Sequence, residues 1–172
     1  TLNNLSKPTV ARVQGAAYGG GVGLVAACDI AIGVFDAQFM LSEVKLGLIP
    51  AVISPYVVAA ISERKARRYM LSAEIFSAAE AYRIGLLHEI VADEESLDEA
   101  IGEIIKALLS GGPQAQAECK DLIRAVSNRT ISEEVADDTG RRIARLRVSP
   151  EGREGMAAFL EKRKPSWILG QS

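Results

Sequence analysis

The first forty residues switch between strand-like and helix-like patterns. Thr9–Gln14 (TVARVQ) alternates apolar and polar side chains, which predicts a strand. Asp29–Phe35 and Ala37–Met40 read as two further short strands. Between them, Gly15–Cys28 reads as a glycine turn that leads into a helix of small apolar residues. This order of strand, turn, helix and strand predicts an α/β unit with parallel strand pairing.

The pattern becomes mainly helical after residue 53. Ser54 and Pro55 predict a helix start, with serine as the N-cap and proline at the first helical position. Ser77 and Glu80 form a capping box, and Gly85 is placed to end that helix. A short strand follows over 86–91, and further helices are predicted over 97–109, 113–126, 131–147 and 151–162.

The patterns divide the chain into an α/β core over 1–75 and a helical region over 76–172. The chain opens in TLNNLSKPTV, immediately before the first core strand, so we expect the whole protein to carry a further N-terminal portion. Several helices of the second region have apolar stripes that a core of this size does not cover. These stripes predict contacts between subunits.

Composition and charge narrow the classes of partner. The chain has 172 residues and a formal net charge of −2, which argues against a protein that holds nucleic acid through a basic surplus. No apolar run is long enough to span a membrane. Cys28 and Cys119 lack metal-ligand spacing and read as free thiols, so we expect a cytoplasmic protein without a metal site.

The stretch Gln14–Asp29 reads QGAAYGGGVGLVAACD and concentrates four glycines at the predicted helix start. A glycine inside a helix costs about 1 kcal/mol relative to alanine, so the cluster needs a reason. The stretch lacks the GxxxxGK[ST] pattern and the spacing of a dinucleotide fingerprint. Two interpretations stay open: an oxyanion hole, in which a backbone N–H faces a carbonyl oxygen that gains negative charge, or tight strand-to-helix packing.

Four segments carry a family pattern in a fixed order: KPTVARVQGAAYGGGVGLVAACDIAI, AQFMLSEVKLGLIPA, SAAEAYRIGLLHEIV and EGREGMAAFLEKRKPSW. They resemble the crotonase (enoyl-CoA hydratase/isomerase) family over nearly the whole chain, and match the C-terminal two thirds of such proteins. The resemblance implies a crotonase/ClpP-like spiral of ββα units with a helical C-terminal trimerisation region. It also implies a homotrimer or dimer of trimers, an acyl-CoA thioester substrate, and no cofactor beyond the coenzyme A of that substrate.

The resemblance assigns the central chemistry to two positions. Gly20 would donate its backbone N–H to the thioester oxygen, while Gly19 and Gly21 let the chain turn and the thioester approach. Glu43 would be the acid/base that moves a proton to or from carbon. In the family, the N-terminal portion supplies a second oxyanion N–H and much of the coenzyme A surface.

Further substrate contacts are expected from flanking residues. Tyr18 and Ser42 lie beside the expected site and would hydrogen-bond substrate or water. By the resemblance, Phe159 and Lys162 of the C-terminal helix would pack against the adenine and pair with a phosphate of coenzyme A bound to a neighbouring subunit. His88, the only histidine, is expected to be structural.

Gly23 departs from the family pattern. Hydratases of the family with two catalytic carboxylates usually place the first one three residues after the oxyanion glycine, and here that residue is Gly23. Three explanations stay open. A residue of the N-terminal portion positions the attacking water; the enzyme uses a single glutamate, as the family's Δ3,Δ2-enoyl-CoA isomerases do; or Gly23 opens substrate-binding space for a bulky or charged acyl group.

A second departure lies in LGLIPAVISPYVVAAI, which differs from the glycine-rich IPGxGGT segment of many straight-chain hydratases. This segment looks like that of bacterial members acting on branched, carboxylated enoyl-CoAs, such as methylglutaconyl-CoA or carboxygeranoyl-CoA. The resemblance thus implies reversible hydration of a 2-enoyl-CoA. The alternatives are an enoyl-CoA isomerase and a catalytically silent protein that binds coenzyme A or another partner.

Overall fold

The structure is a computed structural model that describes residues 1–169, and the chain forms two compact units. The first unit contains residues 1–5 and 9–104, and the second contains residues 6–8 and the chain from Ile105 onward. The units therefore divide later than the boundary expected after Ile75. Residues 76–91 belong to the first unit because they supply two strands to its sheets and a helix that buries Ala78, Ala81 and Ile84.

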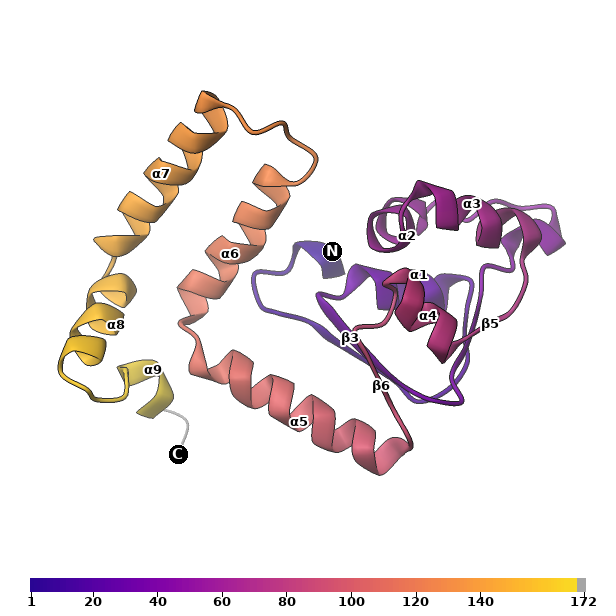
Figure 1. Cartoon of the computed structure of the whole chain (residues 1–172), viewed down its shortest axis with the longest axis horizontal. Coiled ribbons are helices and arrows are strands. Elements are labelled where there is room, and N and C mark those ends of the chain that lie inside the picture. The colour runs from indigo at the N-terminus through magenta and orange to yellow at the C-terminus, as the bar shows by residue number, and fades with distance from the viewer. Residues whose placement is uncertain (170–172) are drawn as a thin grey trace. The chain divides into compact units, whose positions relative to one another are not determined.

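The first unit is built from short strands and helices (Figure 1). Its elements are β1 (Val10–Val13), β2 (Ala17–Tyr18), α1 (Gly20–Ala27), β3 (Ile30–Val34), β4 (Gln38–Met40), α2 (Ser54–Ile61), α3 (Glu63–Ser72), β5 (Phe76–Ser77), α4 (Ala78–Ile84) and β6 (Glu89–Val91), with 3₁₀ turns η1 (Leu2–Asn4) and η2 (Glu43–Leu46). The long helix α5 (Glu94–Ser110) begins in this unit.

Most predicted elements of this unit are confirmed, and the exceptions have local causes. The Ser77 side chain accepts a hydrogen bond from the Glu80 N–H, and Gly85 ends α4 in the left-handed conformation, as the capping pattern predicts. The N-cap of α2 is Ile53 and not Ser54, whose Oγ instead donates to the Ala51 carbonyl at 3.0 Å. The two-residue strands β2 and β5 were not predicted because they are too short to show a period of two.

The strands form two small sheets, and successive strands along the chain are added to both of them. One sheet has the order β1-β3-β6 with parallel pairing, and the other has the order β2-β4-β5, in which β2 and β4 are parallel and β5 is antiparallel to β4. Two consecutive strands therefore enter different sheets before each helical segment: β1 and β2 before α1, then β3 and β4 before α2. This is the expected spiral of ββα units.

The parallel pair β2 and β4 positions the site. Tyr18 is in register with Met40, and the Gly19 N–H donates to the Met40 carbonyl at 2.8 Å. Parallel strands have their carboxyl ends at the same edge of a sheet, which is where α/β folds commonly place their ligands. The glycine turn after β2 and the residues after β4 therefore lie side by side.

An aromatic cluster fixes β4 in the core. The rings of Phe39 and Phe76 lie 5.6 Å apart and those of Tyr69 and Phe76 lie 4.3 Å apart, and all three side chains are buried. The Tyr69 hydroxyl donates to Glu80, which also accepts two hydrogen bonds from Arg83. These bonds, that from Arg83 above all, lower the pKa of Glu80 to about 2, while burial raises the pKa of Tyr69 to about 12.

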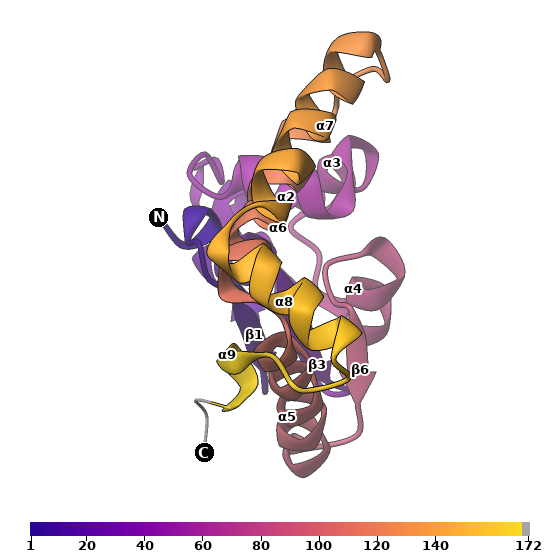
Figure 2. The same cartoon turned by 90° about the vertical axis from the view of Figure 1, so that its left-hand side faces the viewer.

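The second unit consists of helices. It holds the end of α5 and the helices α6 (Pro113–Val126), α7 (Glu133–Arg147), α8 (Pro150–Leu160) and α9 (Ser166–Leu169). The helices α6 and α7 lie side by side, and Figure 2 shows α8 following α7 along the chain. Arg142 and Arg145 of α7 reach α6, where they pair with Asp121 and Glu118 at 2.6 Å each.

A carboxylate from α8 caps the start of α6. The N-cap of α6 is Gly112, which has no side chain to accept the free N–H groups of the first turn. Glu151 supplies that acceptor: Oε2 accepts from the Gln114 N–H at 2.8 Å and Oε1 from the Ala115 N–H at 2.7 Å. Glu151 thus stabilises α6 through two charge-assisted hydrogen bonds.

Replacement of Glu151 by alanine is expected to destabilise the second unit by about 2 kcal/mol, because two N–H groups lose a charged acceptor. Urea unfolding followed by circular dichroism measures the change. The matched control is Glu133→Ala, which removes an exposed glutamate from the first turn of α7 and is expected to cost only about 0.5 kcal/mol. Equal losses in the two variants would contradict the capping role.

Candidate active site

The glycine turn presents free backbone donors. Gly19 ends the turn with φ 49°, and Gly20 is the first residue of α1. In the described part of the chain no group accepts a hydrogen bond from the N–H of Gly20, as expected for the first turn of a helix. A Cβ at Gly20 would have no atom within 4 Å. The Gly20 N–H is therefore free to donate to a ligand oxygen.

Glu43 lies three residues after Met40, the last residue of β4, and its backbone is held in a tight turn. It is the first residue of η2, in which the Lys45 N–H donates to the Ser42 carbonyl at 3.0 Å. The Glu43 carbonyl accepts from the Leu48 N–H at 3.1 Å, and Gly47 closes the turn with φ 70°. The position of Glu43 is thus set by both β4 and the turn that follows.

The Glu43 carboxylate lies against the glycine turn. Its Oε1 is 3.2 Å from the point that a Cβ on Gly19 would occupy, so the absence of a side chain at Gly19 makes room for it. Its Oε2 is buried and has no hydrogen-bond partner among residues 1–169. A buried carboxylate oxygen without a protein partner is costly, and such groups are concentrated at functional sites. The structure thus brings together the glutamate and the glycines that the sequence singled out.

Gly23 is buried and packs against a residue that the sequence analysis did not single out. A Cβ at Gly23 would lie 2.0 Å from Cγ2 and 2.5 Å from Cβ of Ile53. Ile53 therefore occupies the volume next to Gly23, which argues against the explanation that Gly23 itself opens space for a bulky or charged acyl group. The one sequence feature that could have pointed to a role for Ile53 was its position inside the segment that departs from IPGxGGT.

The flanking residues differ in how close they come to the turn. The Ser42 Oγ is 3.5 Å from the point of a Cβ on Gly19, which places it beside the carboxylate of Glu43. The Tyr18 hydroxyl donates to Gln38 Oε1 at 3.3 Å, which links the side chains of β2 and β4. A Cβ at Gly21 would make only ordinary contact, 3.6 Å from Ala17 Cβ, so packing does not require glycine there.

The two expected contacts to coenzyme A lie in the second unit. Phe159, on α8, is 82% exposed, and Lys162 follows the helix with φ 54° and an exposed side chain. Gly20 and Glu43 belong to the first unit. The assignment of Phe159 and Lys162 to coenzyme A therefore stays a prediction, while the exposed aromatic ring is compatible with it.

His88 lies outside the glycine turn and is hydrogen-bonded to the backbone of β3. His88 is structural, since its Nδ1 accepts from the Ala31 N–H at 3.0 Å and its backbone N–H donates to the Ala31 carbonyl at 2.8 Å.

Within residues 1–169, no three histidine, cysteine, aspartate or glutamate side chains group as they would to hold a metal ion. No helix in the same range has the length and apolar character needed to cross a membrane.

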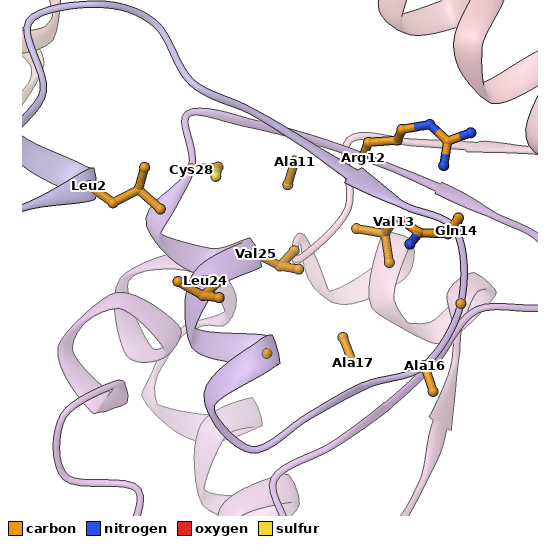
Figure 3. A pocket seen from close by; sticks show the side chains of 12 residues that line it. Leu2, Ala11, Arg12, Val13, Gln14, Ala16, Ala17, Leu24, Val25 and Cys28 are labelled. Carbon is orange, nitrogen blue, oxygen red and sulfur yellow. The ribbon is translucent and has the colours of Figure 1, made fainter.

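An apolar hollow of about 440 Å³ lies between β1 and α1. Figure 3 shows Leu24 and Val25 of α1 on one side of it and Ala11 and Val13 of β1 on the other. The lining includes Gly21 but neither Gly20 nor Glu43. The hollow therefore borders the glycine turn without containing the two residues that carry the chemistry.

The ββα units thus place the glycine turn at the start of α1 next to the carboxylate of Glu43. The enoyl-CoA hydratase/isomerase family model matches residues 1–169, and the chain belongs to this family.

Relatives and solved structures agree with this membership. An enoyl-CoA hydratase structure from Shewanella pealeana is 51% identical with a TM-score of 0.92, covering 96% of this chain and 62% of that one. Enoyl-CoA hydratase AKT6-1 of Alternaria alternata is 38% identical over 92% of this chain and 53% of its own length. Crotonyl-CoA hydratase of Syntrophomonas wolfei is 34% identical over 97% and 64%. The chain thus spans about half the length of the first curated relatives it matches.

Proposed function

We propose that the protein catalyses the reversible hydration of a 2-enoyl-CoA, with Gly20 as oxyanion donor and Glu43 as acid/base. The observation that carries the proposal is the carboxylate of Glu43, which is packed against Gly19, the residue before the free N–H of Gly20, and has one buried oxygen without a protein partner among residues 1–169. Family membership and the names of the relatives support an acyl-CoA thioester as substrate.

The geometry supports the following steps. The thioester oxygen accepts a hydrogen bond from the Gly20 N–H, which draws electron density from the C2–C3 double bond toward that oxygen. Water adds to C3 as the Glu43 carboxylate takes its proton, and the resulting enolate is stabilised at the same N–H. The protonated Glu43 then returns a proton to C2, so that one water is added across the double bond and Glu43 is regenerated.

The absence of a carboxylate at Gly23 favours a second candidate, the isomerisation of a 3-enoyl-CoA. Glu43 would remove a proton from C2 and, after the double bond has shifted through the enolate, return it to C4. This reaction needs the Gly20 N–H and one carboxylate, and both are present. A third candidate, a silent protein that binds coenzyme A or another partner, keeps the fold without turnover.

Exposed apolar residues support an acyl substrate and an oligomer. Leu46, Leu48, Ile49 and Val52, which follow Glu43 closely, are 62–85% exposed and would contact a hydrocarbon acyl group. In the second unit, Ile123 of α6, Ile143 of α7 and Leu160 of α8 are 56–76% exposed. These surfaces support contacts between subunits, which in our proposal build a homotrimer or dimer of trimers. The portion of the relatives outside this chain would supply the second oxyanion donor.

A substrate panel separates the three candidates. The whole protein is incubated with crotonyl-CoA, a 3-enoyl-CoA and methylglutaconyl-CoA, and products are followed by enoyl absorbance and mass. We expect loss of the enoyl absorbance and a product heavier by one water, with the branched, carboxylated substrate turned over fastest. Double-bond migration without a mass change would replace hydratase by isomerase. No turnover, with coenzyme A binding retained, would favour the silent protein.

A further inference from the structure

The contact between Gly23 and Ile53 allows only a narrow set of residue pairs. Ile53 is held at the N-cap of α2, where its carbonyl accepts from the N–H groups of Tyr56 and Val57 at 3.1 and 3.0 Å. It cannot move away from α1 without disturbing the start of α2. Any side chain at position 23 would overlap Cγ2 and Cβ of Ile53, at 2.0 and 2.5 Å.

Alanine at position 53 would not relieve this overlap, because its Cβ coincides with the atom at 2.5 Å. The Cα of Ile53 lies 3.6 Å from the Cβ point of Gly23, which is an ordinary contact. A side chain at position 23 therefore requires glycine at position 53, and a side chain at position 53 requires glycine at position 23.

Two departures from the family pattern follow from this one rule. Position 23 has glycine where two-carboxylate hydratases have glutamate, and position 53 has isoleucine where the segment IPGxGGT has its second glycine. We propose that the pair Gly23 and Ile53 is a reciprocal exchange, in which the glutamate and the glycine of two-carboxylate hydratases are replaced together by glycine and isoleucine. In this exchange Ile53 is a specificity-determining residue that takes the volume of the first catalytic carboxylate. This proposal rests on the proposed function for its chemical consequence and on packing alone for the exchange itself.

The exchange changes what adjoins the reacting carbons. Residues 20 and 23 lie on the same face of α1, three positions apart. A glutamate there would hold a water, whereas Ile53 fills the volume with hydrocarbon. Glu43 is then the one acid/base that this chain supplies next to the glycine turn. The Ile53 side chain presents a hydrocarbon surface there, which favours contact with the hydrocarbon part of an acyl group and disfavours a bound water.

The steric part is tested by thermal unfolding of four variants of the whole protein: Gly23→Ala, Gly23→Glu, Ile53→Gly, and Gly23→Glu combined with Ile53→Gly. We expect Gly23→Ala and Gly23→Glu to lower the unfolding temperature sharply, and Ile53→Gly to restore most of the loss caused by Gly23→Glu. If Gly23→Glu cannot be purified, Gly23→Ala with and without Ile53→Gly gives the same comparison. Wild-type stability of Gly23→Ala and Gly23→Glu with Ile53 retained would overturn the exchange.

The chemical part is tested by the hydration of crotonyl-CoA. The double variant Gly23→Glu/Ile53→Gly is compared with Gly23→Gln/Ile53→Gly, which has the same shape without the carboxylate. We expect the glutamate variant to be faster by at least about tenfold in kcat, because it regains a second acid/base group. Equal rates would overturn the role of Ile53. If the wild type turns over no thioester, the proposed function fails, and the unfolding temperatures still decide the exchange.

Discussion

Replacement of Glu43 by glutamine is expected to lower kcat by about 10³-fold on whichever thioester the wild type turns over, because glutamine can neither take nor return a proton. Glutamine keeps the volume of the side chain next to Gly19, so the fold is expected to stay intact. Steady-state rates on the preferred thioester measure the loss, and circular dichroism verifies the fold.

The control for this substitution is Glu63→Gln. Glu63 lies on α3 with a side chain 80% exposed and only a 3.8 Å ion pair to Arg67, so its replacement is expected to leave kcat unchanged. A Glu43→Gln variant that retains the wild-type rate would remove Glu43 from the site and with it both the hydratase and the isomerase candidates.

Replacement of Gly20 by proline is expected to lower kcat by about 10²-fold to 10³-fold, the usual effect of losing one oxyanion donor. Proline lacks the N–H but suits the first position of a helix. The preceding residue is Gly19, which has no Cβ to clash with the proline ring. The unfolding temperature is therefore expected to change little while turnover falls.

The matched comparison is Gly20→Ala. Alanine retains the N–H, and its Cβ would have no atom of the chain within 4 Å. We expect Gly20→Ala to keep much more activity than Gly20→Pro, which separates the hydrogen bond from the added bulk. Equal losses in the two variants would assign the effect to bulk and contradict the oxyanion role.

Local sequence signals predicted the regular elements well. The alternation in Thr9–Gln14 corresponds to β1, and the capping box of Ser77 and Glu80 starts α4. The strands β2 and β5 have two residues each and exist because of pairing with β4, which no local pattern reports. Since β5 and β6 join strands far earlier in the chain, the extent of the first unit was not visible in the sequence either.

The candidate site depended on contacts distant in sequence. No spacing rule places Glu43 beside Gly19, since their proximity follows from the pairing of β2 with β4. The family resemblance supplied both residues without this geometry. The effect of Ile53 on Gly23 could not be predicted, because it is a packing relation between α1 and the start of α2 across thirty positions of the chain.

The three consecutive glycines of the turn differ in how strongly the fold requires them. Gly19 combines a φ of 49° with the nearby Glu43 carboxylate, so folding and chemistry both oppose its replacement. The surroundings of Gly20 and Gly21 accept a Cβ. A library of variants sorted only for folded protein would therefore let Gly20 drift to other residues, whereas the same library sorted for turnover would retain it. The difference in glycine frequency at position 20 between the two sorted libraries would measure how strongly turnover, as distinct from folding, requires glycine there.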